Sequence, residues 1–183
     1  MNFKYRAQIN VGVFQYPYAE KINPILHNTI KENLDFEHIG TRQTHWNCRS
    51  REFKIIGDYV EGLLKNGYMG NIVFDESSVQ GPLVLLSLWG MWYDNGSYQE
   101  SHHHTPAHWS FVYYVNTPKG SSPLVFDSGC NKKIYPKSGD VVIFPGWLKH
   151  HVPPNKCEGR TSVVGNFYHR LPETRFTNIY SLK

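Results

Sequence analysis

Apolar residues in the first third of the chain recur at helical spacing in two places. The positions are Ile25, Leu26, Ile30 and Leu34 in the first pattern, and Phe53, Ile56, Val60, Leu63 and Leu64 in the second. Spacings of three and four residues place side chains on one face of a helix. The patterns therefore predict two helices, over about residues 24–34 and 53–64. Gly67 and Gly70 follow the second pattern, where a glycine C-cap would end a helix.

From residue 83 onward the pattern changes to short runs rich in Val, Tyr, Phe and Trp, separated by turn signals such as Asp94-Asn95-Gly96. The predicted strands span 83–93, 98–104, 109–116, 124–126, 140–144, 150–152 and 161–168. Their number is typical of a small sandwich or barrel, and the two helices would brace one face of the sheet. We therefore expect a mainly β fold in a single domain over 1–183, with a helical part at 1–80 and a β core at 81–170.

Composition narrows the class of protein. A chain of 183 residues with 40% apolar and 15% aromatic residues has enough material for one core. The net charge of +4 is spread along the chain without a basic run, so we expect no nucleic-acid partner. Three cysteines without a CxxC pair argue against a disulfide framework. The most apolar segment, 82–93, is too short to span a bilayer, and we expect a soluble protein in a reducing cytoplasm.

Six of the ten histidines fall within two short windows, at 102–108 and 150–151. In a strand, residues two apart point to the same side, so His102 and His104 can present their rings together. Neutral imidazoles bind divalent transition metals, and His150 from a distant strand can supply a third ligand. Because His-x-His recurs with a second histidine site, the pattern predicts a metal centre.

The order and spacing of residues across 89–167 carry a family resemblance. The matching positions are Trp89, Gly96, His102, His104, Trp109-Ser110 and Val112-Tyr113-Tyr114, followed by Ser138-Gly139-Asp140, Phe144-Pro145, Trp147-Leu148, His150, Val152, Pro154, Arg160, Ser162 and Asn166. This segment resembles a prolyl-hydroxylase-like group of 2-oxoglutarate/iron(II)-dependent oxygenases that is common in marine bacteria and their phages. The resemblance implies a double-stranded β-helix, also called a jelly roll or cupin-like fold.

The resemblance also implies roles for individual residues. The metal ligands would be His102, His104 and His150, binding Fe(II). Arg160 would bind the far carboxylate of 2-oxoglutarate, since a guanidinium fork matches a planar carboxylate. The remaining candidate co-substrate residues are Ser162, which shares the face of Arg160, together with Tyr113 and Asn166.

The third metal ligand has two candidates. Most members of this superfamily place a carboxylate two residues after the first histidine, where this chain has His104. Glu100 is an alternative, since Glu100, His102 and His104 fall on one face of the predicted strand. His104 is favoured because the related motif also carries a histidine there. Asp127 is explained as a turn residue, and His108, His151 and His169 as bystanders or outer neighbours of the metal.

The activity implied is that of a hydroxylase. An iron(II)- and 2-oxoglutarate-dependent dioxygenase uses O2 to hydroxylate an aliphatic C–H bond and releases succinate and carbon dioxide. The substrate would be a peptide, with peptidyl proline suggested by the resemblance, or a small molecule. For a phage-encoded chain, the compartment would be the host cytoplasm. Two alternatives stay open: a three-histidine cupin dioxygenase that does not use 2-oxoglutarate, and a non-catalytic metal- or ligand-binding cupin module.

Overall fold

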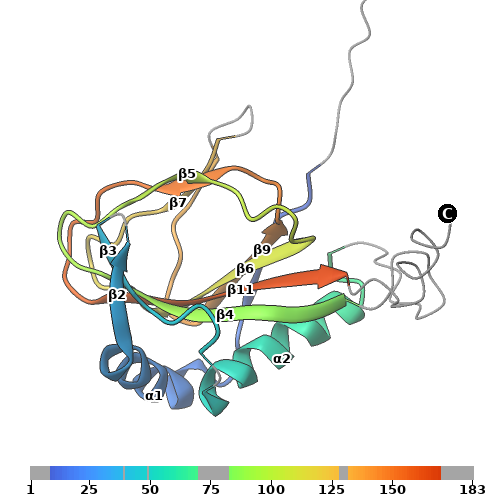
Figure 1. Ribbon diagram of the computed structural model, residues 1–183, viewed down its shortest axis with the longest axis horizontal. Helices are drawn as coiled ribbons and strands as arrows, with labels where there is room; N and C mark the ends of the chain where they lie inside the picture. Colours follow the sequence, from blue (N-terminus) through green and yellow to red (C-terminus); the bar gives the residue numbers. More distant parts are fainter. Residues whose placement is uncertain (1–8, 39, 49, 70–82, 128–131, 170–183) are drawn as a thin grey trace, which may run out of the picture.

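The computed structural model describes residues 9–38, 40–48, 50–69, 83–127 and 132–169. Within these residues the strands form two sheets that face each other (Figure 1), a large one ordered β1-β9-β6-β11-β4-β3-β2 and a small one ordered β5-β10-β7-β8. The elements are β1 (Gly12–Gln15), α1 (Ala19–Glu32), β2 (Leu34–His38), β3 (Thr41–Thr44), α2 (Arg51–Lys65), β4 (Leu83–Tyr93), β5 (Gln99–His102), β6 (Trp109–Asn116), β7 (Leu124–Phe126), β8 (Lys132–Ile134), β9 (Asp140–Pro145), β10 (His150–Val152) and β11 (Arg160–His169). Neighbouring strands within each sheet run antiparallel.

The predicted fold class is confirmed, whereas the predicted content of the N-terminal part is incomplete. The bounds of β4, β6, β7 and β10 coincide with the predicted strands. Residues 1–80, expected to be helical, also contribute β1, β2 and β3 to the large sheet. These strands and β8 are short, and β2, β3 and β8 carry polar or charged side chains at most positions, so they lack the apolar run that marks β7.

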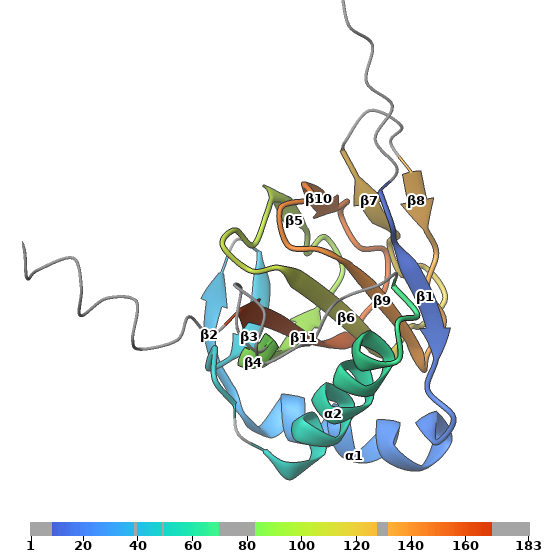
Figure 2. The same ribbon diagram turned by 90° about the vertical axis from the view of Figure 1, so that its right-hand side faces the viewer.

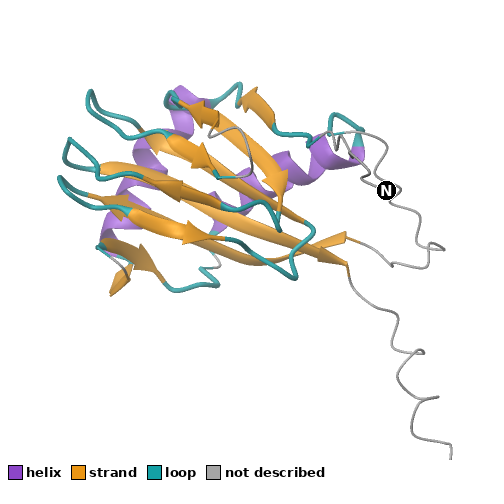
Figure 3. Ribbon diagram, turned by 90° about the horizontal axis from the view of Figure 1, so that it is seen from above, coloured by secondary structure: helices purple, strands orange, loops and turns teal. Residues whose placement is uncertain are grey.

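The two helices lie on one side of the large sheet, away from the small one (Figures 2 and 3). α1 begins at Ala19, earlier than predicted, and carries Pro24 in its interior. α2 begins where the side chain of Ser50 accepts a hydrogen bond from the Phe53 amide, 3.1 Å away. Gly67 follows α2 with φ of 73°, as a glycine C-cap requires, while Gly70 lies outside the described residues. Neither helix has the length and apolar character needed to cross a bilayer.

The large sheet is covered on both faces, so alternate side chains of its strands enter two different cores. On β6, Phe111, Tyr113 and Val115 belong to the core shared with the helices. Val112 and Tyr114 belong to the core between the two sheets. This alternation follows from the period of two in a β-strand. It determines which residues can reach the space between the sheets.

Both helices press on β4 at Gly90. A β-carbon there would lie 2.6 Å from Cγ1 of Ile30 on α1 and 3.0 Å from Cζ of Phe53 on α2. Ile30 and Phe53 are fully buried. The absence of a side chain at Gly90 therefore allows both helices to pack directly against the sheet.

We expect Phe53→Ala to lower the free energy of unfolding by about 3–5 kcal/mol, because it leaves a cavity beneath α2. Ile55→Ala is the matched control, since Ile55 lies on the same helix and is 37% exposed; it should cost about 1 kcal/mol or less. Urea denaturation of the two variants measures both values. Equal losses would contradict the packing of α2 through Phe53.

Candidate metal centre

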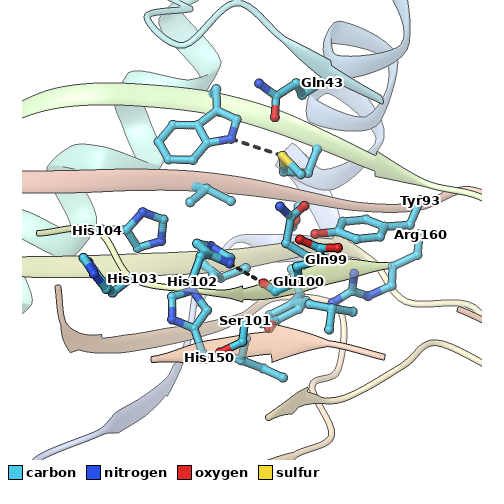
Figure 4. A pocket seen from close by; sticks show the side chains of 18 of the residues that line it. Gln43, Tyr93, Gln99, Glu100, Ser101, His102, His103, His104, His150 and Arg160 are labelled. Atoms are coloured by element: carbon cyan, nitrogen blue, oxygen red, sulfur yellow. Dashed lines mark hydrogen bonds between the residues drawn. The ribbon is translucent and has the colours of Figure 1, made fainter. Parts of the chain in front are cut away.

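Three histidines from two segments of the chain converge at one end of the space between the sheets (Figure 4). His102 ends β5, His104 follows it, and His150 begins β10, the strand paired with β5. His102 and His150 are register partners. The ring centroids lie 4.4 Å apart for His102 and His150, 5.0 Å for His102 and His104, and 5.1 Å for His104 and His150. One ligand atom from each residue lies within 4.8 Å of the others.

The backbone fixes the orientation of two of these rings. Nδ1 of His102 lies 2.7 Å from the carbonyl oxygen of Glu100, and Nδ1 of His150 lies 2.8 Å from that of Leu148. A carbonyl oxygen only accepts, so each Nδ1 donates its proton. In the neutral ring Nε2 then keeps a lone pair, which is the arrangement found in metal-ligating histidines.

Two of the histidines are held in the neutral form. Burial lowers the pKa of His104 to about 3 and that of His150 to about 4, and neighbouring histidines act in the same direction. His104 lies between the rings of Trp89 and Phe144, with centroids at 6.2 and 6.4 Å. Because desolvation disfavours the imidazolium cation, these rings offer lone pairs at neutral pH.

The geometry favours His104 over Glu100 as the third member of the cluster. Among the described residues, the group of converging potential ligands consists of His102, His104 and His150. The part of Glu100 that contacts a cluster member is its backbone carbonyl, which orients His102. His103, between His102 and His104 in the sequence, also lines the cavity but is not one of the three converging residues.

A cavity of about 270 Å³ extends from the histidines between the two sheets. Its walls come from inward-facing residues of β3, β4, β6 and β11, with β5 and β10 opposite. Arg160, the first residue of β11, also lines it and is 1% exposed. The guanidinium carbon lies 4.4 Å from the ring centroid of Tyr93 and 5.5 Å from that of Tyr114. These contacts hold the arginine fork between two aromatic faces.

Among the described residues, no carboxylate forms an ion pair with Arg160. Its buried Nε and Nη1 atoms meet no acceptor there in hydrogen-bonding geometry. Burial raises the pKa of Tyr93 and of Tyr114, so neither phenol supplies a negative charge. An unpaired buried cation is strongly unfavourable. The site is therefore suited to an anionic ligand that completes the pair.

The side chains of Gln43 and Tyr114 also have a buried polar atom without a hydrogen-bond partner among the described residues. Among the described residues, the buried side-chain nitrogen and oxygen atoms without a hydrogen-bond partner are Gln43 Nε2, Tyr114 Oη, Arg160 Nε and Arg160 Nη1. Every one of these side chains lines the cavity. In the sheet register Gln43 faces Met91, Met91 faces Ser162, and Ser162 faces Tyr114, which forms one row across four strands. Unsatisfied hydrogen-bonding capacity is thus concentrated on one stretch of the cavity wall.

Two predicted co-substrate residues lie elsewhere. The hydroxyl of Tyr113 donates to Oδ1 of Asn23 on α1, 2.5 Å away, so this residue faces the helices. The side chain of Asn166 accepts from Ser110 Oγ at 2.7 Å and donates to Ser87 Oγ at 3.1 Å. Neither lines the cavity, whereas Ser162 does. The expectation for Tyr113 is wrong because alternation turns it away and presents Tyr114 instead.

Tyr93, Tyr114 and Gln43 are polar wall residues to which the sequence analysis assigned no role. Tyr113 and Tyr114 are adjacent and chemically identical, so only the strand register distinguishes them. Tyr93 faces Arg160 across the β4–β11 ladder. Gln43 lies on β3, which was not predicted at all. The residues that face Arg160 and Ser162 on the neighbouring strands could have been identified only if the pairing of the strands had been known.

Comparison with known proteins identifies the fold. No protein-family model matches the chain, and a search of curated protein sequences finds no match. A viral collagen prolyl hydroxylase from Paramecium Bursaria Chlorella virus-1, solved as its 2OG complex, has a TM-score of 0.66 at 16% identity, over 88% of this chain and 96% of that one. A prolyl-4-hydroxylase from Pseudomonas putida gives 0.66 at 17% identity, over 88% and 94%.

A third similar structure has three ligands bound. HygX from Streptomyces hygroscopicus, solved with nickel, 2-oxoglutarate and hygromycin B bound, has a TM-score of 0.62 at 14% identity, over 87% of this chain and 83% of that one. At these identities the similarity is one of fold. The chain therefore has the double-stranded β-helix fold found in prolyl hydroxylases and other 2-oxoglutarate/iron(II) oxygenases.

Proposed function

We propose that the chain is an iron(II)- and 2-oxoglutarate-dependent dioxygenase that hydroxylates an aliphatic C–H bond. The observation that carries this proposal is a single cavity with three clustered imidazoles at one end and a buried, unpaired arginine further along its wall. A ligand with a metal-chelating end and a carboxylate end would satisfy both. The similar structures of the viral prolyl hydroxylase and of HygX contain 2-oxoglutarate, and HygX has been solved with nickel or with iron bound.

The histidine cluster fits a divalent first-row transition metal. His102, His104 and His150 together present three nitrogen donors, a set that suits iron, zinc, copper or nickel. Three protein ligands leave coordination positions for a co-substrate and dioxygen. Without a carboxylate ligand, the metal centre carries one more unit of positive charge than in a site of two histidines and one acid, which alters its redox tuning.

The opposite wall fits the far carboxylate of 2-oxoglutarate. Arg160 offers Nε and Nη1, and Tyr114 and Gln43 offer further donors that have no partner among the residues that the structure describes. Ser162 lies in the same row as Tyr114 and adds a hydroxyl. When bound, iron and 2-oxoglutarate supply the oxidising chemistry, in which decarboxylation to succinate accompanies hydroxylation by O2. The chain orients both ends of the co-substrate and surrounds it with aromatic walls that exclude water.

Two alternative functions stand beside this one. A three-histidine cupin dioxygenase would use the same metal ligands without 2-oxoglutarate, and a non-catalytic module would bind a metal or ligand without turnover. The unpaired Arg160 favours the 2-oxoglutarate-dependent enzyme, because neither alternative requires an anion at that position. Succinate release coupled to substrate oxidation indicates the 2-oxoglutarate-dependent enzyme. Substrate oxidation without succinate indicates the three-histidine dioxygenase, and the absence of both indicates the non-catalytic module.

The substrate side of the cavity is apolar. Of the large hydrophobic side chains that the described residues leave exposed, Trp46 is the one that lines the cavity, and it is 44% exposed. Its ring packs on Trp89 with centroids 4.8 Å apart, and Trp89 in turn contacts His104. This aromatic wall leads from the surface to the histidines. We infer that an apolar part of the substrate, such as the ring of a peptidyl proline, lies against Trp46.

The first prediction concerns the two ends of the co-substrate. Anaerobic addition of iron(II) and 2-oxoglutarate should produce a weak visible charge-transfer band in the wild type and none in His104→Ala. Arg160→Met keeps the side-chain length but removes a charge-assisted interaction, so it should weaken 2-oxoglutarate binding roughly ten- to a hundredfold. Arg42→Met is the control, since Arg42 is exposed and paired with Asp94. An unchanged affinity in Arg160→Met would remove its role.

The second prediction concerns pH. Since the pKa values of His104 and His150 are lowered to about 3 and about 4, both rings are already deprotonated at pH 5.5. Metal binding should therefore release at most about one proton between roughly pH 5 and 6.5, and the dissociation constant for Co(II) should change at most about tenfold per pH unit. Calorimetric titration at several pH values measures this slope. Release of two or three protons would contradict burial of these rings.

The third prediction concerns Trp46. We expect short, capped peptides with apolar side chains, proline included, to stimulate succinate formation more than charged peptides of equal length. Trp46→Ala should reduce that stimulation about tenfold or more, since tryptophans that become buried on binding contribute much of the binding energy at interfaces. Trp147→Ala is the control, because Trp147 is 55% exposed and does not line the cavity. The charge-transfer band should persist in both variants; full stimulation of Trp46→Ala would exclude this wall as the docking site.

A further inference from the structure

Asp127 lies beside the histidine cluster and contacts the sequence neighbours of two of its members. One carboxylate oxygen accepts a hydrogen bond from the hydroxyl of Ser101, and the other lies 2.6 Å from Nδ1 of His151. Ser101 immediately precedes His102, and His151 immediately follows His150. A single carboxylate therefore links the two chain segments that carry two of the proposed metal ligands.

The backbone of Asp127 adds a third link. Its amide donates to the carbonyl oxygen of Lys149, 3.0 Å away, at the beginning of β10. Asp127 itself follows the end of β7, the neighbour of β10 on the other side from β5. The residue thus joins β7, β10 and β5. The expectation that turn chemistry alone explains Asp127 is too narrow.

The ladder between β5 and β10 provides little of this restraint by itself. β5 has four residues and β10 has three, and β5 is the edge strand of its sheet. Only two register pairs join them, His150 with His102 and Val152 with Gln99, and the register shifts between these pairs. Because short edge ladders with an irregularity are easily displaced, backbone pairing alone leaves the separation of His102 and His150 weakly fixed.

We propose that Asp127 is a positioning residue that holds His102 and His150 at the separation needed to bind one metal ion. This inference rests on the proposed metal centre, but it assigns a role to a residue that does not itself belong to the cluster. The hydrogen bonds to Ser101 and His151 act as a clasp across the weak ladder. Groups that orient metal ligands typically change metal affinity ten- to a hundredfold when they are removed.

The test measures Co(II) affinity by competition with a chelator, with the visible absorption of bound Co(II) as a report of ligand geometry. Asp127→Ala should raise the dissociation constant roughly ten- to a hundredfold and alter the spectrum. Asp127→Asn should stay within about threefold of the wild type, because the amide can still accept from Ser101 and a neutral histidine can change tautomer to meet it. Asp58→Ala is the control, as Asp58 is an exposed carboxylate paired with Lys54 on α2.

Thermal melting of the metal-free proteins separates positioning from general stability. If Asp127→Ala does not fold, Ser101→Ala removes one arm of the clasp and should raise the dissociation constant in the same direction. Equal Co(II) affinity in the wild type and in the folded variant lacking the clasp would overturn the inference and leave the metal centre intact. An Asp127→Asn variant as impaired as Asp127→Ala would also overturn it. A wild type that binds no Co(II) would instead contradict the proposed function.

Discussion

The large sheet has to satisfy two apolar interfaces at once, one against the helices and one against the small sheet. Each of its central strands therefore divides its side chains between two cores, and the division is decided by the period of two along the strand. A shift of one residue in β11 would turn Arg160 toward the helices and away from the cavity that the histidines line. The chemistry of the site thus depends on a register that is fixed mainly by apolar packing.

The polar residues of the cavity between the two sheets are arranged to suit a bound ligand. Buried donors in a folded chain normally find partners, and the exceptions in the described part of this chain lie together on one wall opposite the histidine cluster. The histidines show the complementary property, since burial keeps two of them neutral and backbone carbonyls orient two of the rings. One end of the cavity presents imidazole lone pairs, and the other presents hydrogen-bond donors. This polarity is what a ligand with a chelating end and an anionic end requires.

Parts of this arrangement could be read from the sequence, and the reason differs from residue to residue. His102 and His104 are two apart, so their common direction follows from local geometry, and Arg160 and Ser162 share a face for the same reason. The choice between Tyr113 and Tyr114 needed the pairing of β6 with β11, which joins distant segments. Gln43 could not be predicted as a wall residue, because β3 is only four residues long and its place in the sheet follows from the pairing of Gln43 with Met91. The roles of Asp127 and His151 likewise depend on contacts between strands.

The proposed ends of the ligand site belong to opposite sheets, the histidines to the small sheet and its following loop and Arg160 to the large one. The distance between those ends is therefore set by how closely the sheets pack. Phe126 and Phe144 meet across that interface with ring centroids 5.2 Å apart, and Phe144 also contacts His150. Neither phenylalanine lines the cavity. In the proposed enzyme, the packing of Phe126 on Phe144 would therefore influence which length of co-substrate can span the two ends.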